Sequence, residues 1–449
     1  MRVEPGCGDC QLEPGRRGKS GDLTSALGLC AMLILLPIVV RLPIGLFEGK
    51  LTLLEPVTAL TLAAWLVAWI RGRVRPDLSL RVYIPLLLFL AVGFVSVFVA
   101  RSASAALVEL ATYANGALIF FLVHQIVTGS ERGRTLGFTG LITGMVVVLV
   151  TCSVGTAGIM RCAPIPALVS RAGKLTATFM TSSQLPSYLV VILPLALCGA
   201  MASSSRSRRL ASGLGAAAAA FGLCASGSRS GVIAAVIAVF AYVLWRSRRR
   251  LRALVLLSTF AIAIFSFAYV TENAHCMGPL SRSLSTFNPS AAPVSADPAS
   301  EGTASVRFLF LQAWAEIART RPLLGVGAGN FKLAYTEIIP EATRGFELHN
   351  TLLSIWAETG VLGLLSFAAF LVPFGWIGLR SLIRRPITRI EEYRAAIAFG
   401  ILGSLMHQMF HMGLRQPIFW VGLGFLLALD QIARQKGTGP LVSHPREAM

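Results

Sequence analysis

Three ionisable residues at the ends of apolar stretches are the first candidates for chemistry in this sequence. Arg229 lies in the short run Ser226–Gly231 between two apolar stretches, and His349 directly precedes another. Arg307 opens a pattern of apolar residues at helical spacing. A charge at the edge of an apolar stretch costs free energy unless a partner or water compensates it, so such residues are functional candidates. The imidazole of His349 can also accept a proton near neutral pH.

Each of the three residues also has an interpretation without chemistry. Arg229 could extend to a membrane interface and keep its charge in water. Arg307 could be a solvated residue on the polar side of an amphipathic helix. His349 could be a structural histidine. Residue type and spacing leave both interpretations open for each.

A glycine-rich run is a weaker candidate. It contains Gly325, Gly327, Gly329 and Asn330. It lacks the Gly-Lys-Ser/Thr of a P-loop, and no strand and βαβ unit surround it as a dinucleotide fingerprint requires. We expect a turn in which the backbone approaches a lipid or a sugar.

The composition decides what kind of protein must position these residues. Of 449 residues, 55% are hydrophobic and only 14% are charged. A soluble chain carries about 25% charged residues, so a soluble enzyme is excluded. Disorder is excluded as well, because so apolar a chain can offset its ordering entropy by burial. The composition therefore predicts an all-α, polytopic membrane helix bundle.

Apolar runs of spanning length predict about twelve transmembrane helices. The predicted spans are Ser25–Arg41, Leu51–Ile70, Val82–Ala100, Leu107–Val127, Leu136–Gly155, Leu185–Ala202, Leu210–Ala225, Gly231–Trp245, Leu251–Val270, Thr351–Leu379, Ala395–Met412 and Ile418–Ile432.

The basic residues alternate with these spans. Clusters of arginine and lysine precede the first span and follow the second, fourth, sixth, eighth, tenth and twelfth. Because cytoplasmic loops hold an excess of Lys and Arg, we expect both termini in the cytoplasm and the odd-numbered connections outside. Most of the net charge of +19 then reflects membrane topology and not a nucleic-acid partner.

One connection is large enough to hold a site. The chain divides into an N-terminal tail (1–22), nine spans (23–270), a large outer loop (271–350), three spans (351–433) and a C-terminal tail (434–449). Loops beyond about 15 residues usually carry function or structure of their own. Within this loop, Val306, Phe310, Ala313 and Ile317 predict an amphipathic helix over Ser305–Thr320, whose apolar stripe would rest on the membrane interface or on the bundle.

Cysteines and carboxylates give little support for a metal. Cys7 and Cys10 form a CxxC with no second pair nearby, so we do not expect a metal or redox role. No paired aspartates suit a hard cation, and Glu337 and Glu341 are the nearest carboxylate pair. We expect no metal and no other cofactor.

Three segments form a composite pattern: Arg321–Phe331, His349–Leu353 and Glu358–Gly363. Together they resemble the signature of the O-antigen ligase and O-antigen polymerase superfamily, polytopic bacterial glycosyltransferases that use undecaprenyl-pyrophosphate-linked glycans. Ser226–Gly231 resembles the family's arginine turn, and Phe179–Leu195 resembles an earlier span. Relatives often carry Asn before the sixth span, where this chain has Ser182-Ser183-Gln184, which puts a sugar contact there in doubt.

The resemblance implies a GT-C-like fold and a role for each candidate. Arg229 and Arg307 would hold the pyrophosphate, because the planar guanidinium binds phosphate oxygens and stays charged. His349 would be the general base on an acceptor hydroxyl, in a single displacement that inverts the anomeric centre. Asn350 and the turn Gly325–Asn330 would position the substrate. Arg415 would be either a further phosphate contact or, as we favour, an anchor at the membrane interface.

Several functions are compatible with the resemblance. An O-antigen ligase, with lipid A-core as acceptor, is our first expectation, in the inner membrane of a bacterium with the site on the periplasmic face. A polymerase with a lipid-linked repeat as acceptor, or a protein O-oligosaccharyltransferase, is the alternative. Rivals from other classes are a polysaccharide or lipid transporter, which usually shows inverted repeats and polar groups at mid-membrane, and a structural membrane scaffold. The sequence also leaves open whether Glu347 orients His349 or faces water.

Overall fold

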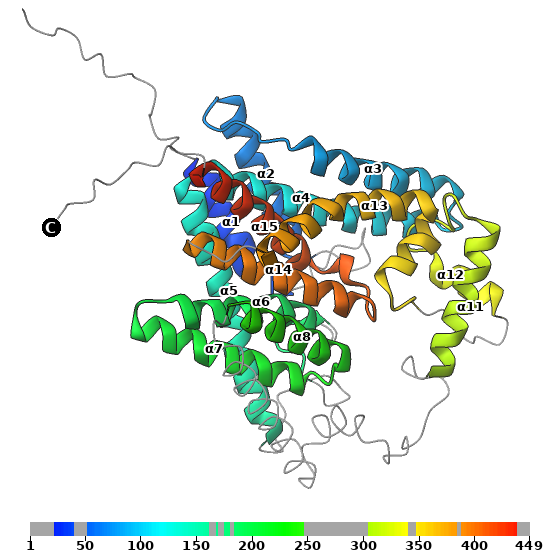
Figure 1. The fold of residues 1–449 in the computed structure, drawn as a ribbon. Coiled ribbons are helices and arrows are strands. Elements are labelled where there is room, and N and C mark those ends of the chain that lie inside the picture. Colours follow the sequence, from blue (N-terminus) through cyan, green and yellow to red (C-terminus); the bar gives the residue numbers. More distant parts are fainter. Residues whose placement is uncertain are drawn as a thin grey trace, which may run out of the picture.

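The described part of this computed structural model is built from helices. It covers residues 22–39, 52–160, 168, 175–179, 184–246, 304–339, 347–383 and 388–437. These residues form 13 α-helices and two short 3-10 turns, and no strand. The predicted all-α class is confirmed (Figure 1).

Every predicted span but the ninth coincides with a helix. These helices are α1 (Leu23–Leu35), α2 (Leu54–Ile70), α3 (Leu80–Ser96), α4 (Ala103–Gly129), α5 (Glu131–Met160), α6 (Gln184–Ala202), α7 (Arg206–Ala225), α8 (Arg229–Arg246), α13 (Thr351–Ile383), α14 (Arg389–Gln408) and α15 (Pro417–Gly437). The ninth predicted span, Leu251–Val270, lies outside the described residues, as do Cys7, Cys10 and the first part of the large loop.

Membrane crossing is supported by length and composition. Six helices of the described chain, α3, α4, α5, α6, α13 and α15, are long and apolar enough to span a membrane, and α1, α2 and most of α8 are apolar but shorter. In contrast, α7 and α14 begin with charged turns at Arg206 and Arg389. The protein is thus a polytopic helix bundle, while the count of twelve crossings stays a prediction.

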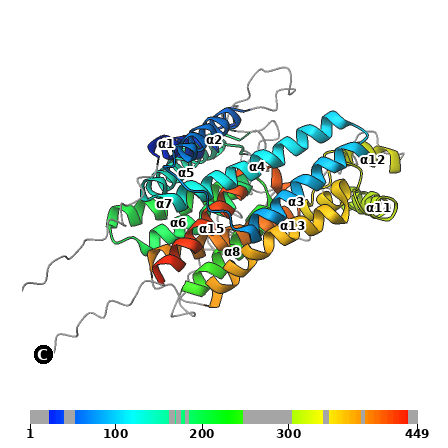
Figure 2. The ribbon, with the colours of Figure 1, turned by 90° about the horizontal axis from the view of Figure 1, so that it is seen from above.

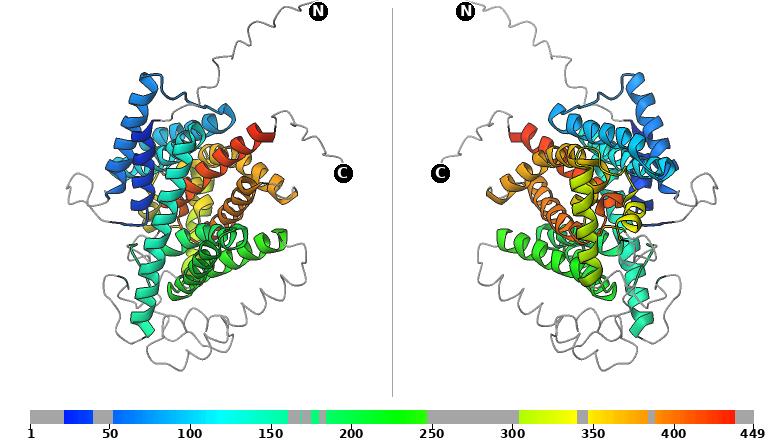
Figure 3. Two further views of the ribbon diagram at one scale, coloured as in Figure 1. Left: turned by 90° about the vertical axis from the view of Figure 1, so that its left-hand side faces the viewer. Right: turned by 90° about the vertical axis from the view of Figure 1, so that its right-hand side faces the viewer.

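The C-terminal helices form the centre of the bundle. Helix α15 contacts α4, α6, α13 and α14, and its Phe419, Trp420 and Phe425 are fully buried. Figure 3 shows α14 and α15 between the N-terminal helices and the group α6, α7 and α8. The Trp420 indole packs against Gly116 of α4, where any side chain would collide with the ring. Helices from both halves of the sequence therefore share one core.

Basic connections gather at one end of the bundle, here called the basic end. Arg246 at the end of α8 pairs with Glu392 at the start of α14, with 2.9 Å between nitrogen and oxygen. Arg389 donates to Ser204 in the turn between α6 and α7 at 3.3 Å. Figure 1 shows these connections far from α11 and α12. Basic connections that alternate with the spans along the sequence thus lie together at one end of the folded bundle.

The opposite end, here called the loop end, holds the described part of the large loop (Figure 2). Helix α11 (Ala304–Thr320) confirms the predicted amphipathic helix. Its apolar residues Phe310, Ala313 and Ile317 are buried in one cluster with residues of α12 (Phe331–Ile338) and α13. The apolar stripe of α11 therefore packs against the protein and not against a membrane interface, which were the two predicted alternatives. The short helix α12 is an element that the sequence analysis does not predict.

Candidate active site

His349 lies at the loop end, just before α13, where it is half-buried. Its ring centroid is 6.2 Å from that of Phe310 in α11 and 5.9 Å from that of His411, which follows α14. The histidine predicted as a base therefore sits where α11, α13 and the turn after α14 meet.

His349 is the first of three imidazoles that lie in a row, followed by His411 and His407. The rings of His411 and His407 are 4.7 Å apart between centroids. His407, near the end of α14, is fully buried, and its Nδ1 lies 3.1 Å from Ser230 Oγ in the first turn of α8. The row thus connects His349 to the start of α8.

The two predicted arginines stand at helix starts beside this row. Arg229 is the first residue of α8 and precedes Ser230. Arg307 lies in the first turn of α11, one turn before Phe310. Both side chains lie outside what the structure describes. Their backbones nevertheless place both arginines on elements that contact the histidine row, and helix N-termini carry partial positive charge.

Local hydrogen bonds fix the backbone around His349. Asn350 caps α13, because its Oδ1 accepts from Leu353 N at 3.1 Å and its carbonyl accepts from Ser354 N at 2.9 Å. Ser354 Oγ donates to Leu348 O at 2.7 Å. Asn350 thus fixes the start of α13, while its predicted role in positioning the substrate stays a prediction.

Thr351 ties this segment to the turn 409–416. Its Oγ1 donates to His411 O and accepts from Gly413 N, each at 2.9 Å. The same hydroxyl therefore fixes the turn against the first residue of α13. His349 and His411 are consequently held on two backbones that are joined to each other.

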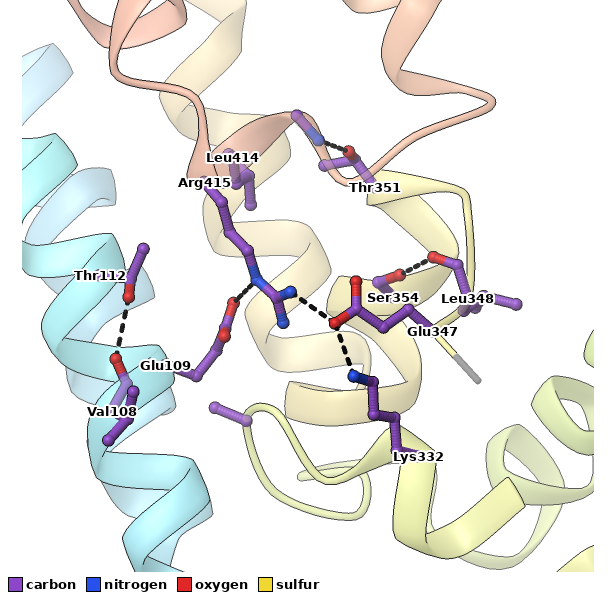
Figure 4. A network of polar contacts seen from close by, with 12 residues as sticks. Val108, Glu109, Thr112, Lys332, Glu347, Leu348, Thr351, Ser354, Leu414 and Arg415 are labelled. Carbon is purple, nitrogen blue, oxygen red and sulfur yellow. Dashed lines mark hydrogen bonds and ion pairs between the residues drawn. The ribbon is translucent and has the colours of Figure 1, made fainter. Parts of the chain in front are cut away.

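Arg415 forms ion pairs inside the protein (Figure 4). Its Nε donates to Glu109 of α4 and its second guanidinium nitrogen donates to Glu347, both at 2.8 Å. Lys332 of α12 lies 3.0 Å from the same Glu347 oxygen. These ion pairs form a bridge that joins α4, the last turn and the loop, while the phosphate contact and the membrane-interface anchor stay predictions.

Glu347 is the centre of this bridge. Its carboxylate pairs with Arg415 and Lys332. Burial raises the pKa of Glu347, but the two cations outweigh this and hold the pKa at about 2. For Arg415, burial lowers the pKa, but Glu109 and Glu347 more than compensate and raise it above its ordinary value. Both groups are charged at neutral pH, so the bridge is a true ion-pair network.

The glycine-rich run forms a compact turn wedged between helices. Gly325, Gly327 and Gly329 all have positive φ, at 63°, 92° and 67°. A Cβ would collide with the Ala357 carbonyl at Gly325 and with Ala100 at Gly327. These contacts lie between α13 and the connection from α3 to α4. The predicted turn is therefore confirmed as a turn, while its approach to a substrate stays a prediction.

Asn330 locks this turn from inside. It is buried, its Oδ1 accepts from Ser102 N at 2.8 Å, and its Nδ2 donates to the carbonyls of Ser102 at 3.2 Å and Ala328 at 2.9 Å. The side chain thus bonds to protein through both of its polar atoms. The structure places Asn330 as a support of the loop against the start of α4.

Several polar residues of this region were missed by sequence reasoning. They are Glu109, Lys332, Glu358, His407 and His411. Glu358, in the motif of the resemblance, is buried in α13 and interacts electrostatically with Glu109 and Arg415. The pair His407 and His411 could have been found, because the sequence places two imidazoles four residues apart within the predicted span Ala395–Met412. Glu109 is a single carboxylate in a long apolar run, which is also a recognisable signal.

Within the described residues, no three His, Cys, Asp or Glu side chains are grouped as a metal site. The three imidazoles form a row along the loop end. The absence of a metal from the reaction stays a prediction.

Comparison with known proteins bears on the same region. Residues 214–368 match the family of O-antigen ligases. This stretch includes Arg229, Arg307, His349 and the glycine-rich turn, whereas Glu109, His411 and Arg415 lie outside it. No curated protein matches the chain. The matched stretch shows that the chain carries an O-antigen ligase domain, which supports the resemblance to the O-antigen ligase and polymerase superfamily.

Proposed function

We propose that the protein is an O-antigen ligase, which transfers a glycan from undecaprenyl pyrophosphate to a hydroxyl of the lipid A-core. The observation that carries this proposal is the convergence at the loop end. There the start of α8, the start of α11 and His349 meet through one row of aromatic and polar contacts. All three elements belong to the matched domain.

Arg229 and Arg307 would bind the pyrophosphate of the donor. A guanidinium binds two phosphate oxygens at once and keeps its charge throughout the accessible pH range. The N-termini of α8 and α11 add partial positive charge for an anion. Each well-placed donor at such a site contributes about 3 kcal/mol to stabilising the charge that develops on the leaving group.

His349 would be the base that activates the acceptor. It removes the proton of the acceptor hydroxyl while the oxygen bonds to the anomeric carbon. The bond from that carbon to the pyrophosphate breaks at the same time, and its electron pair leaves with the pyrophosphate. One displacement of this kind inverts the anomeric centre and requires no metal.

The charge pattern supports an orientation for this reaction. Because basic connections prefer the cytoplasm, the basic end would face the cytoplasm of a bacterial inner membrane and both termini would lie there. The loop end would then face the periplasm, where it meets the lipid-linked donor and the glycan acceptor among membrane lipids.

A deletion strain complemented with variants tests the proposal in cells. We expect the wild-type gene to restore polymer on the lipid A-core, and Arg229→Ala, Arg307→Ala and His349→Ala to fail although each protein is inserted at normal levels. Arg319→Ala is the matched control for Arg307→Ala, because Arg319 lies on the same helix, is exposed and pairs only locally with Glu316. It should complement fully.

The pattern of the surface polysaccharide separates the alternatives. Loss of all polymer from the core in the deletion strain supports the ligase. A core capped with a single repeat would instead indicate a polymerase, and loss of glycan from a protein would indicate a protein O-oligosaccharyltransferase. Full complementation by His349→Ala would contradict the assignment of the base.

A further inference from the structure

The turn 409–416 is connected to His349 from several directions, although it lies outside the matched domain. The His411 ring contacts the His349 ring. Thr351 and Glu347, which flank His349, are bound to the turn through Gly413 and Arg415. A turn that only connected α14 to α15 would not need these contacts with the residues before and after His349. The turn therefore belongs to the surroundings of His349.

Burial distinguishes the three imidazoles. His407 is fully buried and ends the row at Ser230, whereas His349 and His411 are half-buried. A proton on His407 would have no direct contact with water. His349 and His411 are therefore the two imidazoles of the row from which a proton can pass to solvent.

Charged residues stand on each element that packs against the pair. Glu347 stands on the segment of His349, Lys332 on α12 and Arg415 on the turn. Arg229 and Arg307 begin α8 and α11. Glu347 is already bound by two cations, and Glu358 of α13 interacts with Glu109 and Arg415. Both carboxylates therefore interact with other charged groups.

We propose that His349 and His411 act as one proton-accepting pair, in which His411 is the positioning residue that shares and releases the proton of His349. The proposal rests on the function proposed above. When the acceptor oxygen bonds to the anomeric carbon and pyrophosphate leaves with its electron pair, the hydroxyl proton passes to His349. It then moves to His411 and from there to water, which leaves both rings neutral for the next turnover.

Two rings in contact cannot both be charged without repulsion, so the pair should lose its protons in two steps. Histidine NMR in detergent micelles can observe this directly, because the chain has only six histidines. We expect the His349 signal, assigned by its loss in His349→Gln, to titrate in two steps in the wild type and in one step in His411→Gln. Met409→Gln is the matched control, since it places the same amide at an exposed position of the same turn.

The kinetic counterpart uses the purified full-length protein and a lipid-pyrophosphate glycan donor. We expect His411→Gln to lower kcat about tenfold near neutral pH and to change the acid limb of the pH profile from a two-proton to a one-proton slope. A merely structural residue would lower kcat without changing that slope. Met409→Gln should retain the wild-type profile.

The outcomes separate the two proposals. An unchanged His349 titration and an unchanged pH slope in His411→Gln would overturn the proton-accepting pair, whether or not the protein transfers glycan. A wild-type protein that forms no glycosidic bond would overturn the proposed function, and the NMR titration would still decide whether the two imidazoles are coupled. One-step titration of His349 in the wild type also contradicts the pair.

Discussion

The guanidinium of Arg415 lies 2.8 Å from the carboxylate of Glu347, two residues before His349. The two residues are 68 positions apart in the sequence, and the same guanidinium reaches Glu109 across 306 positions. One side chain therefore joins the fourth helix, the last turn and the segment that carries the proposed base.

Loss of this bridge should destabilise the loop end. Arg415→Gln leaves the buried carboxylate of Glu109 without its cation, which typically costs about 3 kcal/mol. We expect a clearly lower unfolding temperature for the purified protein in detergent micelles. Arg319→Gln removes an exposed arginine whose ion pair is local, and it should leave the unfolding temperature unchanged. Equal unfolding temperatures for the two variants would show that the bridge contributes no stability.

Acid should weaken the same bridge in a defined range. The pKa of Glu347 is lowered in the folded protein from 4.5 to about 2, so its stabilising effect is present above pH 4.5 and is lost as the pH falls from 4.5 towards 2. The free energy of unfolding of the wild type should exceed that of Glu347→Gln by on the order of 2 kcal/mol at pH 6. The difference should shrink below pH 4.5. A difference that grows on acidification would contradict the assigned ion pairs.

A side chain at Gly327 should disturb the turn that supports the loop. Its φ of 92° is unfavourable for any other residue, and a Cβ would collide with Ala100. We expect Gly327→Ala to lower the free energy of unfolding by about 2 kcal/mol. Gly378→Ala, in α13 with open space around the new methyl group, is the control and should be neutral or slightly stabilising. If both variants unfold alike, the turn is not held in the conformation described.

Asn330 offers a test of its role as a support. Asn330→Asp keeps the oxygen that accepts from Ser102 but loses the donated bonds to Ser102 and Ala328. We expect a loss of about 1–3 kcal/mol of stability with little change in the KM for the glycan donor. Unchanged stability together with a tenfold higher KM would instead indicate that Asn330 contacts the substrate.

Local patterns in the sequence predict the helices well and single out the three candidate site residues, whose roles stay predictions. Apolar runs locate the helices of the bundle, and the spacing of Phe310, Ala313 and Ile317 predicts α11. The motif around His349 identifies the segment that enters the bundle. Each of these signals depends on residues that are close in the sequence, and for this reason they can be recognised in a single chain.

Long-range pairings could not be predicted in the same way. His407 meets Ser230 across 177 positions, and nothing near either residue indicates the other. The same holds for Arg415, whose pairing with Glu109 and Glu347 spans 306 and 68 positions. Helix α12, with 8 residues, is also too short to show a clear helical periodicity of apolar residues in the sequence. Packing of distant helices, and not local preference, decides these features.

Transfer by the purified protein is the measurement that tests the central claim most directly. Wild-type protein, supplied with an undecaprenyl-pyrophosphate glycan and lipid A-core, should form a glycosidic bond of inverted configuration that mass spectrometry and NMR detect. His349→Ala, folded as judged by its unfolding temperature, should be slower by about 10²–10⁴-fold. Equal rates for the two proteins, or no product with the wild type, would contradict the account.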